Sequence, residues 1–163
     1  MKLRPAPIYM HDDLKPHRIP DGVILVQDTR EQKGLWKPQP WIVEKGLKTG
    51  DYSVVGMEEM VTVERKSIID LFGSLGKGRK RFDREIERML KMKWAGLMIE
   101  GLEDKVMRRQ YRSQMNVQSV YGSLCSMETD GIHIYFADSK RSAKDWILSR
   151  LIRFYEHYRL GKI

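Results

Sequence analysis

The sequence VTVERKSIIDLFGSL, residues 61–75, changes from the periodicity of a β-strand to that of a helix. Its first six residues alternate as in a strand, so Glu64 and Lys66, two positions apart, project to the same face. Ser67 then begins a helix, and Asp70 three residues later completes the Ser-x-x-Asp pattern of a helix cap. The stretch therefore predicts a strand that leads directly into a capped helix.

Strand and helix patterns alternate along the rest of the chain. Buried-strand patterns occur at residues 23–28, 95–100 and 132–136. Amphipathic helix patterns occur at residues 79–93, 117–125 and 142–158. Strands separated by helices predict an α/β fold with a mixed central sheet that is flanked by helices.

The N-terminal residues differ in composition from the remainder. Residues 1–20 hold four of the six prolines and little periodicity, which predicts an extended arm. Residues 21–163 show no internal boundary and are predicted to form one domain, large enough for a core. No apolar run approaches the roughly 20 residues that a membrane-spanning helix needs, and the arm lacks the apolar region of a secretory signal. We therefore expect no membrane association.

A single cysteine, Cys125, excludes an intrachain disulfide and a cysteine-rich zinc site. This usage fits a reducing compartment, so we expect a cytoplasmic location, close to the nucleoid if the source is prokaryotic or viral. Cys125 lies on the apolar stripe of the predicted helix at residues 117–125, and we interpret it as a core residue.

The charge of the chain predicts a polyanionic partner. The net charge is +8 and the isoelectric point is about 9.6. Residues 77–93 contain eight basic and three acidic residues, a pattern that is also typical of a solvated helix with internal ion pairs. The position of this segment, directly after a group of carboxylates, favours nucleic-acid binding. The candidate contacts are Arg79, Lys80, Arg81 and Arg84.

Carboxylates gather in one part of the chain. Asp51 lies in a predicted turn, and Glu64, Lys66 and Asp70 follow within twenty residues of it. Hard carboxylate oxygens hold Mg²⁺, and a nearby cation orients water or offsets charge in phosphodiester cleavage. Taken singly, these residues fit a turn aspartate and a surface ion pair better than a metal site. Taken together, they are the residue types that a divalent-metal site requires.

Three groups of residues form a more specific signature. They are Gly50-Asp51-Tyr52, then Glu64-Arg65-Lys66 with Asp70 four residues beyond Lys66, and then Gly73-Ser74-Leu75 with Gly78-Arg79. An apolar strand that ends in Asp28-Thr29-Arg30-Glu31 precedes them. This arrangement closely resembles the nuclease domain of the XPF family of structure-specific endonucleases, most strongly over residues 23–100.

The resemblance implies a restriction-endonuclease-like fold and a DNA endonuclease that depends on Mg²⁺ or Mn²⁺. Its substrates would be branched DNA (flaps, forks or junctions) in recombination or repair. Asp51 and Glu64 are expected to bind the metal directly, with Asp28 and the backbone carbonyl of Arg65 completing the shell. The residues expected to carry catalysis are Asp28, Asp51, Glu64, Arg65, Lys66 and Asp70.

The remaining residues of the signature have more than one expected role. Lys66 would position the attacking water or neutralise the charge that develops on the phosphate. Asp70 would cap its helix, orient Lys66, or do both. Arg30 and Arg65 are candidates for gripping phosphates by forked hydrogen bonds. Arg65, however, faces away from Lys66 by strand alternation, so it could instead brace an acid such as Glu31.

The chain lacks the tandem helix-hairpin-helix motifs that extend typical members of this family. DNA would then be held by the basic surface, by a dimer mate or by another protein. The predicted helix at residues 142–158 has a second apolar stripe, Leu148, Ile152 and Tyr155, which is either core or a self-association surface. Family members pair through helices in this region, which implies a homodimer.

Two other functions stay open at the level of sequence. The chain could be a non-catalytic DNA-binding or scaffold subunit that retains the site residues. It could also be a sequence-specific, restriction-type endonuclease with the same fold. Metal-dependent cleavage of DNA would reject the non-catalytic subunit. Cleavage of branched DNA irrespective of sequence would reject the restriction-type enzyme.

Overall fold

The stretch that begins at residue 61 forms a strand followed directly by a helix in the computed structural model. These elements are β4 (Val61–Ser67) and α1 (Ile68–Leu75). The Ser67 hydroxyl accepts a hydrogen bond from the Asp70 N–H at 3.1 Å and so caps α1. The predicted strand and its capped helix are confirmed.

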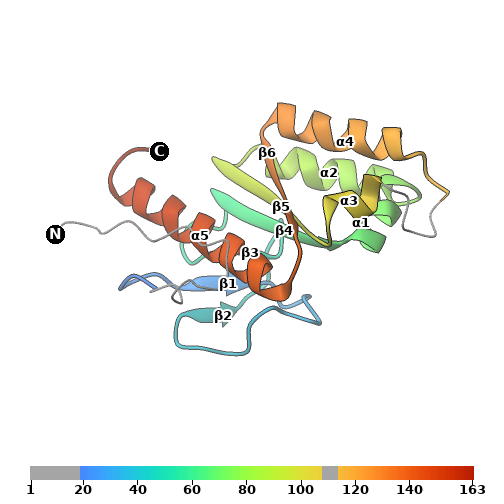
Figure 1. Ribbon diagram of the computed structural model, residues 1–163. Coiled ribbons are helices and arrows are strands. Elements are labelled where there is room, and N and C mark those ends of the chain that lie inside the picture. The colour runs from blue at the N-terminus through green and yellow to red at the C-terminus, as the bar shows by residue number, and fades with distance from the viewer. Residues whose placement is uncertain (1–18, 108–113) are drawn as a thin grey trace.

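From β4 onward the elements follow the predicted alternation of strands and helices, whereas the described chain before β4 forms only strands (Figure 1). The structure describes residues 19–107 and 114–163. The remaining strands are β1 (Leu25–Gln27), β2 (Ile42–Glu44), β3 (Tyr52–Val54), β5 (Trp94–Glu100) and β6 (Ile132–Ala137). The remaining helices are α2 (Arg79–Met89), α3 (Glu103–Met107), α4 (Val117–Asp130) and α5 (Lys140–Arg159). The sequence did not predict β2 and α3, which are too short to leave a periodic pattern.

The six strands form one mixed sheet in the order β2-β1-β3-β4-β5-β6. Strand β3 runs antiparallel to both β1 and β4, whereas β4, β5 and β6 are mutually parallel, as are β1 and β2. The connections from β4 to β5 and from β5 to β6 contain helices, whereas a loop joins the parallel pair β1 and β2. This is the mixed central sheet that the sequence predicted.

Helices cover both faces of the sheet and bury a separate core on each (Figure 1). Helix α5 packs on one face, and α1, α2 and α4 pack on the other. Strand β5 shows the division: Met98 belongs to the α5 core, whereas its neighbours Leu97 and Ile99 belong to the opposite core. A strand that is buried on both faces reads as a continuous apolar run, which is why β5 was recognisable.

Three local expectations need correction or refinement. The helix predicted for residues 79–93 ends at Met89, because the chain turns there and Lys93 donates its N–H to the Met60 carbonyl at 2.9 Å as β5 begins. Cys125 is half-buried rather than a core residue. The buried line of α4 runs through Val120, Leu124 and Met127, so the predicted stripe is right at Val120 and Leu124 but not at Cys125.

The second apolar stripe of α5 is part of the monomer core. Leu148 and Ile152 are buried against the sheet, and Tyr155 packs partly buried against the same cluster. These side chains are therefore covered within one chain, which favours the core interpretation of the stripe.

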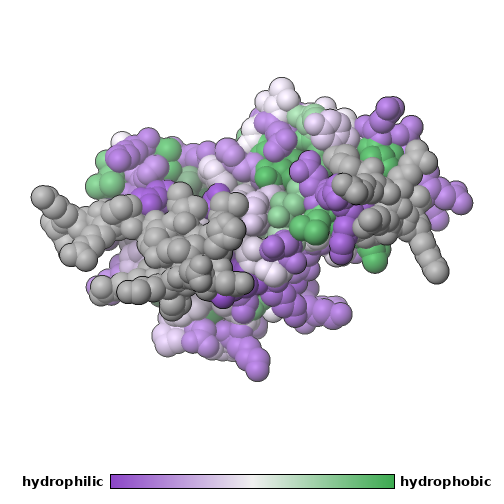
Figure 2. All heavy atoms as spheres, viewed as in Figure 1, coloured by the Kyte–Doolittle hydropathy of each residue, from purple (hydrophilic) through white to green (hydrophobic). Residues whose placement is uncertain are grey.

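The predicted arm at residues 1–20 lies outside the described residues except for its last two positions, of which Ile19 packs against the α5 core. Within residues 19–107 and 114–163, no helix combines the length and apolarity that crossing a membrane would require. On the face that Figure 2 shows, hydrophilic residues cover much of the described surface.

Candidate active site

The turn that carries Asp51 is built around Gly50. Gly50 adopts a φ of +76°, and a Cβ at this position would overlap the Thr62 hydroxyl. Glycine avoids both the strain and the overlap. The Asp51 N–H donates to the Val63 carbonyl at 2.9 Å, and the Asp51 carbonyl accepts from the Asp28 N–H at 2.8 Å. Asp51 is thus held between β1 and β4, at the start of β3.

Asp51 and Glu64 form a pair of enclosed carboxylates. Asp51 Oδ2 accepts a hydrogen bond from the Arg65 N–H at 2.8 Å, which directs the carboxylate toward β4. Burial and the nearby charge of Glu64 raise the pKa of Asp51 to about 8. Burial also raises the pKa of Glu64, against the opposing effect of Lys66. The pair is short of positive charge, so a bound cation would stabilise its ionised form.

Lys66 lies beside this pair, on the face of β4 that strand alternation predicted. Its Nζ donates to Glu64 Oε1 at 2.8 Å and lies 4.8 Å from the centre of the Phe82 ring. The Phe82 ring, from α2, holds the ammonium by a cation–π contact. Lys66 is therefore a positive charge in a defined position next to two carboxylates.

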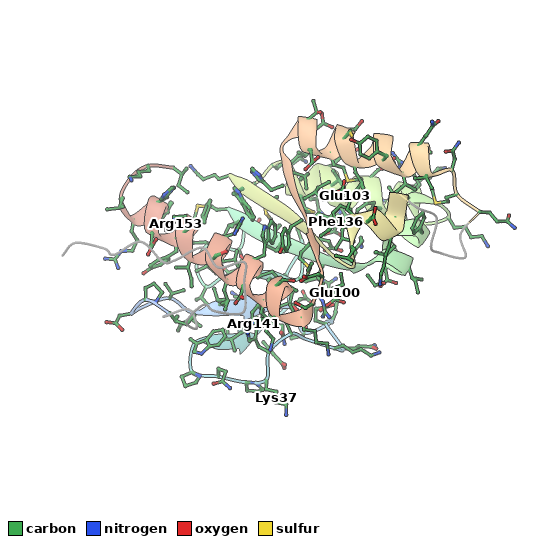
Figure 3. All side chains as sticks on the ribbon, viewed as in Figure 1. Lys37, Glu100, Glu103, Phe136, Arg141 and Arg153 are labelled. Atoms are coloured by element: carbon green, nitrogen blue, oxygen red, sulfur yellow. The ribbon has the colours of Figure 1, made fainter. Side chains whose placement is uncertain are left out.

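Arg65 points to the other side of β4 and braces two acids. Its Nε and Nη2 donate to Glu100 Oε1 at 3.0 and 2.7 Å, and its Nη1 donates to Glu31 Oε2 at 2.8 Å. Nη1 also donates to the Lys33 carbonyl at 2.7 Å. Glu100, labelled in Figure 3, ends β5, so Arg65 ties β4 and β5 to the loop after β1. Of its two expected roles, the structure contains the contact to Glu31; phosphate binding stays a prediction.

Asp28 binds Arg30 and the loop at residue 47. Its Oδ1 accepts from the Arg30 N–H at 2.7 Å and Nε at 2.9 Å, and its Oδ2 accepts from Arg30 Nη2 at 3.0 Å and the Leu47 N–H at 2.7 Å. Although burial opposes the effect, these hydrogen bonds lower the pKa of Asp28. The carboxylate is occupied by protein donors, and metal binding by Asp28 stays a prediction.

Asp70 is exposed and acts within its own helix cap. Its Oδ2 accepts from the Ser67 hydroxyl at 2.6 Å, and its N–H donates back to the same hydroxyl. Of the roles expected for Asp70, the structure contains the cap. Orientation of Lys66 by Asp70 stays a prediction.

Glu85 on α2 reaches the same site, and the sequence interpretation missed it. Glu85 Oε1 accepts from the Gly50 N–H at 3.1 Å, and its charge contributes to the raised pKa of Glu64, whose largest cause is burial. A signal was present, because Glu85 follows Phe82 by three residues and precedes Ile86 on the buried side of α2. It was obscured because Glu85 was counted only as one of the acids in a basic segment.

The predicted DNA-binding residues on α2 are exposed. Lys80, Arg81 and Arg84 point to solvent at the amino-terminal end of the helix. Arg79 donates to Asp83 at 2.9 Å and to the Ser123 hydroxyl of α4 at 3.0 Å, so its guanidinium is oriented. A fifth predicted contact, Arg30, pairs with an acid but keeps 71% of its side chain exposed. All five side chains are exposed, and phosphate binding by them stays a prediction.

The carboxylates at this site suit a magnesium or manganese ion that takes only some of its ligands from the protein. Among residues 19–107 and 114–163, no group of three acidic, histidine or cysteine side chains is arranged to enclose a metal. Mg²⁺ commonly binds one or two carboxylates and keeps several waters, which substrate phosphates replace. Glu64 is buried and Asp51 is half-buried, and together they supply that number of carboxylates.

Comparison with known proteins identifies the family. The ERCC4 domain model matches residues 15–149. No curated protein matches the chain. Two solved structures are similar to it. XPF from Aeropyrum pernix shares 23% identity at a TM-score of 0.60 and covers 80% of this chain. The same protein in complex with DNA shares 23% identity at a TM-score of 0.61 and covers 82%.

The chain spans 60% and 65% of the lengths of those two XPF chains. At this identity, the likeness establishes the restriction-endonuclease-like fold of the nuclease domain, with its mixed six-stranded sheet between helices. The family match covers the turn that carries Asp51 and the strand that carries Glu64 and Lys66. The chain belongs to the ERCC4 domain family, the family that includes the XPF nuclease domain.

Proposed function

We propose that this protein is a divalent-metal-dependent endonuclease that hydrolyses DNA phosphodiesters at branched structures. The observation that carries the proposal is the enclosed Asp51–Glu64 pair with the Lys66 ammonium fixed beside it, inside an ERCC4 domain. Buried acids without enough positive charge are costly, so their presence in a fold of this family supports a catalytic use.

Asp51, Glu64 and the carbonyl of Arg65 would hold Mg²⁺ or Mn²⁺. When bound, such an ion supplies Lewis-acid stabilisation of the charge that develops on the scissile phosphate. Residues of the chain itself would keep both carboxylates ionised and oriented toward the ion. The Arg65 N–H does this for Asp51, and the Lys66 ammonium does it for Glu64.

Lys66 would act on the attacking water or on the phosphate itself. Its ammonium has three donors, of which Glu64 engages one at 2.8 Å, leaving donors for a water or a phosphate oxygen. The Phe82 ring limits where the group can move. A fixed cation next to the reacting phosphate contributes by electrostatic preorganisation.

Arg30, Arg79, Lys80, Arg81 and Arg84 would bind the DNA backbone. Phosphate contacts position DNA without reading bases, which suits a nuclease that selects DNA shape. The related XPF structure was solved as a complex with DNA. We extend that binding to this chain, together with a preference for flaps, forks or junctions and a role in recombination or repair.

A second copy of the chain, in a homodimer, or another protein would supply the remaining contacts to DNA. The apolar side chains available for pairing lie at the end of α5, because Leu148 and Ile152 are buried inside the monomer. Tyr158, Leu160 and Ile163 are exposed there, at 41%, 53% and 42%. Light scattering of the purified chain measures its mass in solution, and a monomer at all concentrations would leave only the protein-partner form of this proposal.

Cleavage of end-labelled fork, flap, Holliday-junction, single-stranded and linear duplex DNAs tests the proposed function. The expected result is metal-dependent cutting close to the branch point, the same in several sequences. Cutting of one sequence in linear duplex would instead support a restriction-type enzyme. Tight binding of DNA without cutting in Mg²⁺ or Mn²⁺ would support the non-catalytic subunit.

A further inference from the structure

The turn at residues 49–51 is held from two sides, and one side is helix α2. The Thr62 hydroxyl on β4 donates to the Thr49 carbonyl at 3.0 Å. From α2, Arg88 Nε donates to the Thr49 hydroxyl at 3.3 Å, and Glu85 Oε1 accepts from the Gly50 N–H at 3.1 Å. Arg88 Nη2 also pairs with Glu85 Oε2 at 2.8 Å. Glu85 and Arg88 therefore act as one unit against the turn.

The hydrogen bond from the Gly50 N–H does not require a charged acceptor at residue 85. A neutral glutamine would accept the same hydrogen bond. Glutamine would not keep the ion pair with Arg88 Nη2 at 2.8 Å, and it would place no negative charge beside the turn that carries Asp51. The charge of Glu85 therefore serves the pair with Arg88 and the surroundings of Asp51 rather than the hydrogen bond to Gly50.

We propose that Glu85 is a positioning residue for the metal site, which fixes the Thr49–Gly50 peptide directly before Asp51 and adds negative charge that attracts the cation. This inference rests on the proposed function, since it concerns how that site binds its ion. Partners that orient metal ligands are typically worth about 10- to 100-fold in metal affinity. The same helix presents Lys80, Arg81 and Arg84, so α2 connects the DNA-binding surface to the turn that carries Asp51.

Two substitutions at residue 85 separate its hydrogen bond from its charge. Glu85→Ala removes both, and Glu85→Gln keeps an acceptor for the Gly50 N–H. Glu87→Gln is the matched control, because Glu87 is exposed on the same helix. Mn²⁺ binding is measured by calorimetry without DNA, and hydrogen exchange is measured for the amides of residues 49–51. Thermal denaturation shows that each variant is folded.

The expected result is Mn²⁺ binding about tenfold weaker in Glu85→Ala, with faster exchange of the Gly50 amide. Glu85→Gln should protect that amide almost as in the wild type and still bind Mn²⁺ several-fold more weakly. Wild-type Mn²⁺ affinity in Glu85→Ala would overturn the inference, as would a wild type that binds no Mn²⁺. If the wild type binds Mn²⁺ as expected but cuts no DNA, the proposed function fails while the positioning role stands.

A separate observation concerns two adjoining cavities at the start of β5. One, of about 320 Å³, is lined by Lys93, Trp94, Arg150 and His157 among others. The other, of about 380 Å³, shares Trp94 and Arg150 and adds His133 and Glu128. Lys93, which lines the first cavity, is the last residue of the basic segment at residues 77–93. Arg153, labelled in Figure 3, lies on the same part of α5.

Arg150 is the most unusual group in these cavities. It is half-buried, its guanidinium lies 5.2 Å from the centre of the Trp146 ring, and it donates to the Ser149 hydroxyl at 2.8 Å. Burial lowers its pKa. Within the described residues no carboxylate pairs with it. A partly buried cation without an anion is costly, and a bound anion would offset that cost.

The geometry points to a second phosphate site here, in which Arg150, Lys93 and His157 take a backbone phosphate of DNA away from the cleavage site. The test is DNA affinity by fluorescence anisotropy over a series of salt concentrations for wild type and Arg150→Gln. Arg159→Gln is the control, since Arg159 lies over the Tyr155 ring on the same helix but lines neither cavity.

Arg150→Gln should weaken binding of all DNA sequences alike and lower the salt slope by about one, whereas the control should change neither. Inorganic phosphate, titrated against tryptophan fluorescence, distinguishes a site for free phosphate from one that needs the strand. Unchanged DNA affinity and salt slope in Arg150→Gln would overturn the proposal, and quenching by free phosphate at micromolar concentration would replace DNA as its ligand.

Discussion

Lys66 Nζ lies 2.8 Å from Glu64 Oε1, two positions away on the same face of β4, and 4.8 Å from the centre of the Phe82 ring. The ammonium therefore neutralises Glu64 and is held in place by the Phe82 ring. Under the proposed function, Lys66→Ala should lower single-turnover DNA cleavage by about 100-fold or more, because removing one preorganised donor to a developing charge typically costs about that factor.

The control for Lys66→Ala is Lys45→Ala, which removes an exposed ion pair of similar length, 2.7 Å to Glu58. That variant should cut DNA as the wild type does. Equal DNA affinity in both variants, measured in Ca²⁺, would locate the defect in catalysis. A Lys66→Ala enzyme with wild-type cleavage would remove Lys66 from the site.

Asp51→Asn should stabilise the protein when metal is removed. Burial and Glu64 raise the pKa of Asp51 from 3.8 to about 8, so ionisation at higher pH destabilises the fold. For a raised pKa, the stabilising contribution is complete below about pH 4 and is lost as pH rises toward 8. Asparagine has no charge to lose and still offers an acceptor to the Arg65 N–H.

In chelator at pH 8, we therefore expect Asp51→Asn to exceed the wild type by several kcal/mol in the free energy of unfolding, because a raised pKa costs about 1.4 kcal/mol for each pH unit between the unfolded and folded values. At pH 4 the two proteins should be about equal. Urea denaturation at both values of pH measures the difference. A variant that is less stable than the wild type at pH 8 would contradict the pKa assignment.

Gly50→Ala should destabilise the fold more than Gly56→Ala. Both glycines have a positive φ, +76° and +81°, but a Cβ at residue 50 overlaps the Thr62 hydroxyl whereas one at residue 56 meets no atom within 4 Å. The backbone strain common to both is about 1 kcal/mol, and the overlap adds to it. Thermal denaturation of both variants gives the difference. Equal losses would mean that the turn can move away from β4.

Arg65→Gln should lower stability by about 3 kcal/mol, because it leaves Glu31 and Glu100 without their partner in a site where the Arg65 side chain is only 11% exposed. Arg65→Lys should restore little of this stability, since one ammonium cannot replace the forked hydrogen bonds of the guanidinium. Lys48→Gln removes an ion pair with Glu59 between side chains that are 83% and 72% exposed, and it is the milder control. The midpoint of denaturation measures the loss of stability in each variant. A stable Arg65→Gln protein that has lost only DNA affinity would favour phosphate binding over bracing.

The predictable part of the fold is the part that carries strong local patterns. Continuous apolar runs gave β5 and β6, and a capping pattern placed the start of α1 at Ser67. Three-residue strands and a five-residue helix leave no such pattern, so β2 and α3 emerged only from the structure. The end of α2 was also missed, because the chain turns at Met89 to begin β5 and no local signal marks the turn.

The candidate site also has a part that the sequence predicted and a part that it did not. Strand alternation placed Glu64 with Lys66 and turned Arg65 toward Glu31, both as found. It could not show that the Asp28 carboxylate would be taken up by Arg30 and a loop amide, because that depends on tertiary hydrogen bonds. Glu85 was missed for the same reason: its contact to Gly50 joins residues that are 35 positions apart.

The central claim is that Asp51 and Glu64 bind a catalytic divalent ion. The most direct test is single-turnover cleavage of a labelled fork at saturating enzyme, in Mg²⁺, in Mn²⁺ and in chelator, for wild type and Asp51→Asn. The account predicts that the wild type cuts only with metal, and that Asp51→Asn binds the fork equally well but does not cut. Cutting by the wild type in chelator, or full activity of Asp51→Asn, would contradict it.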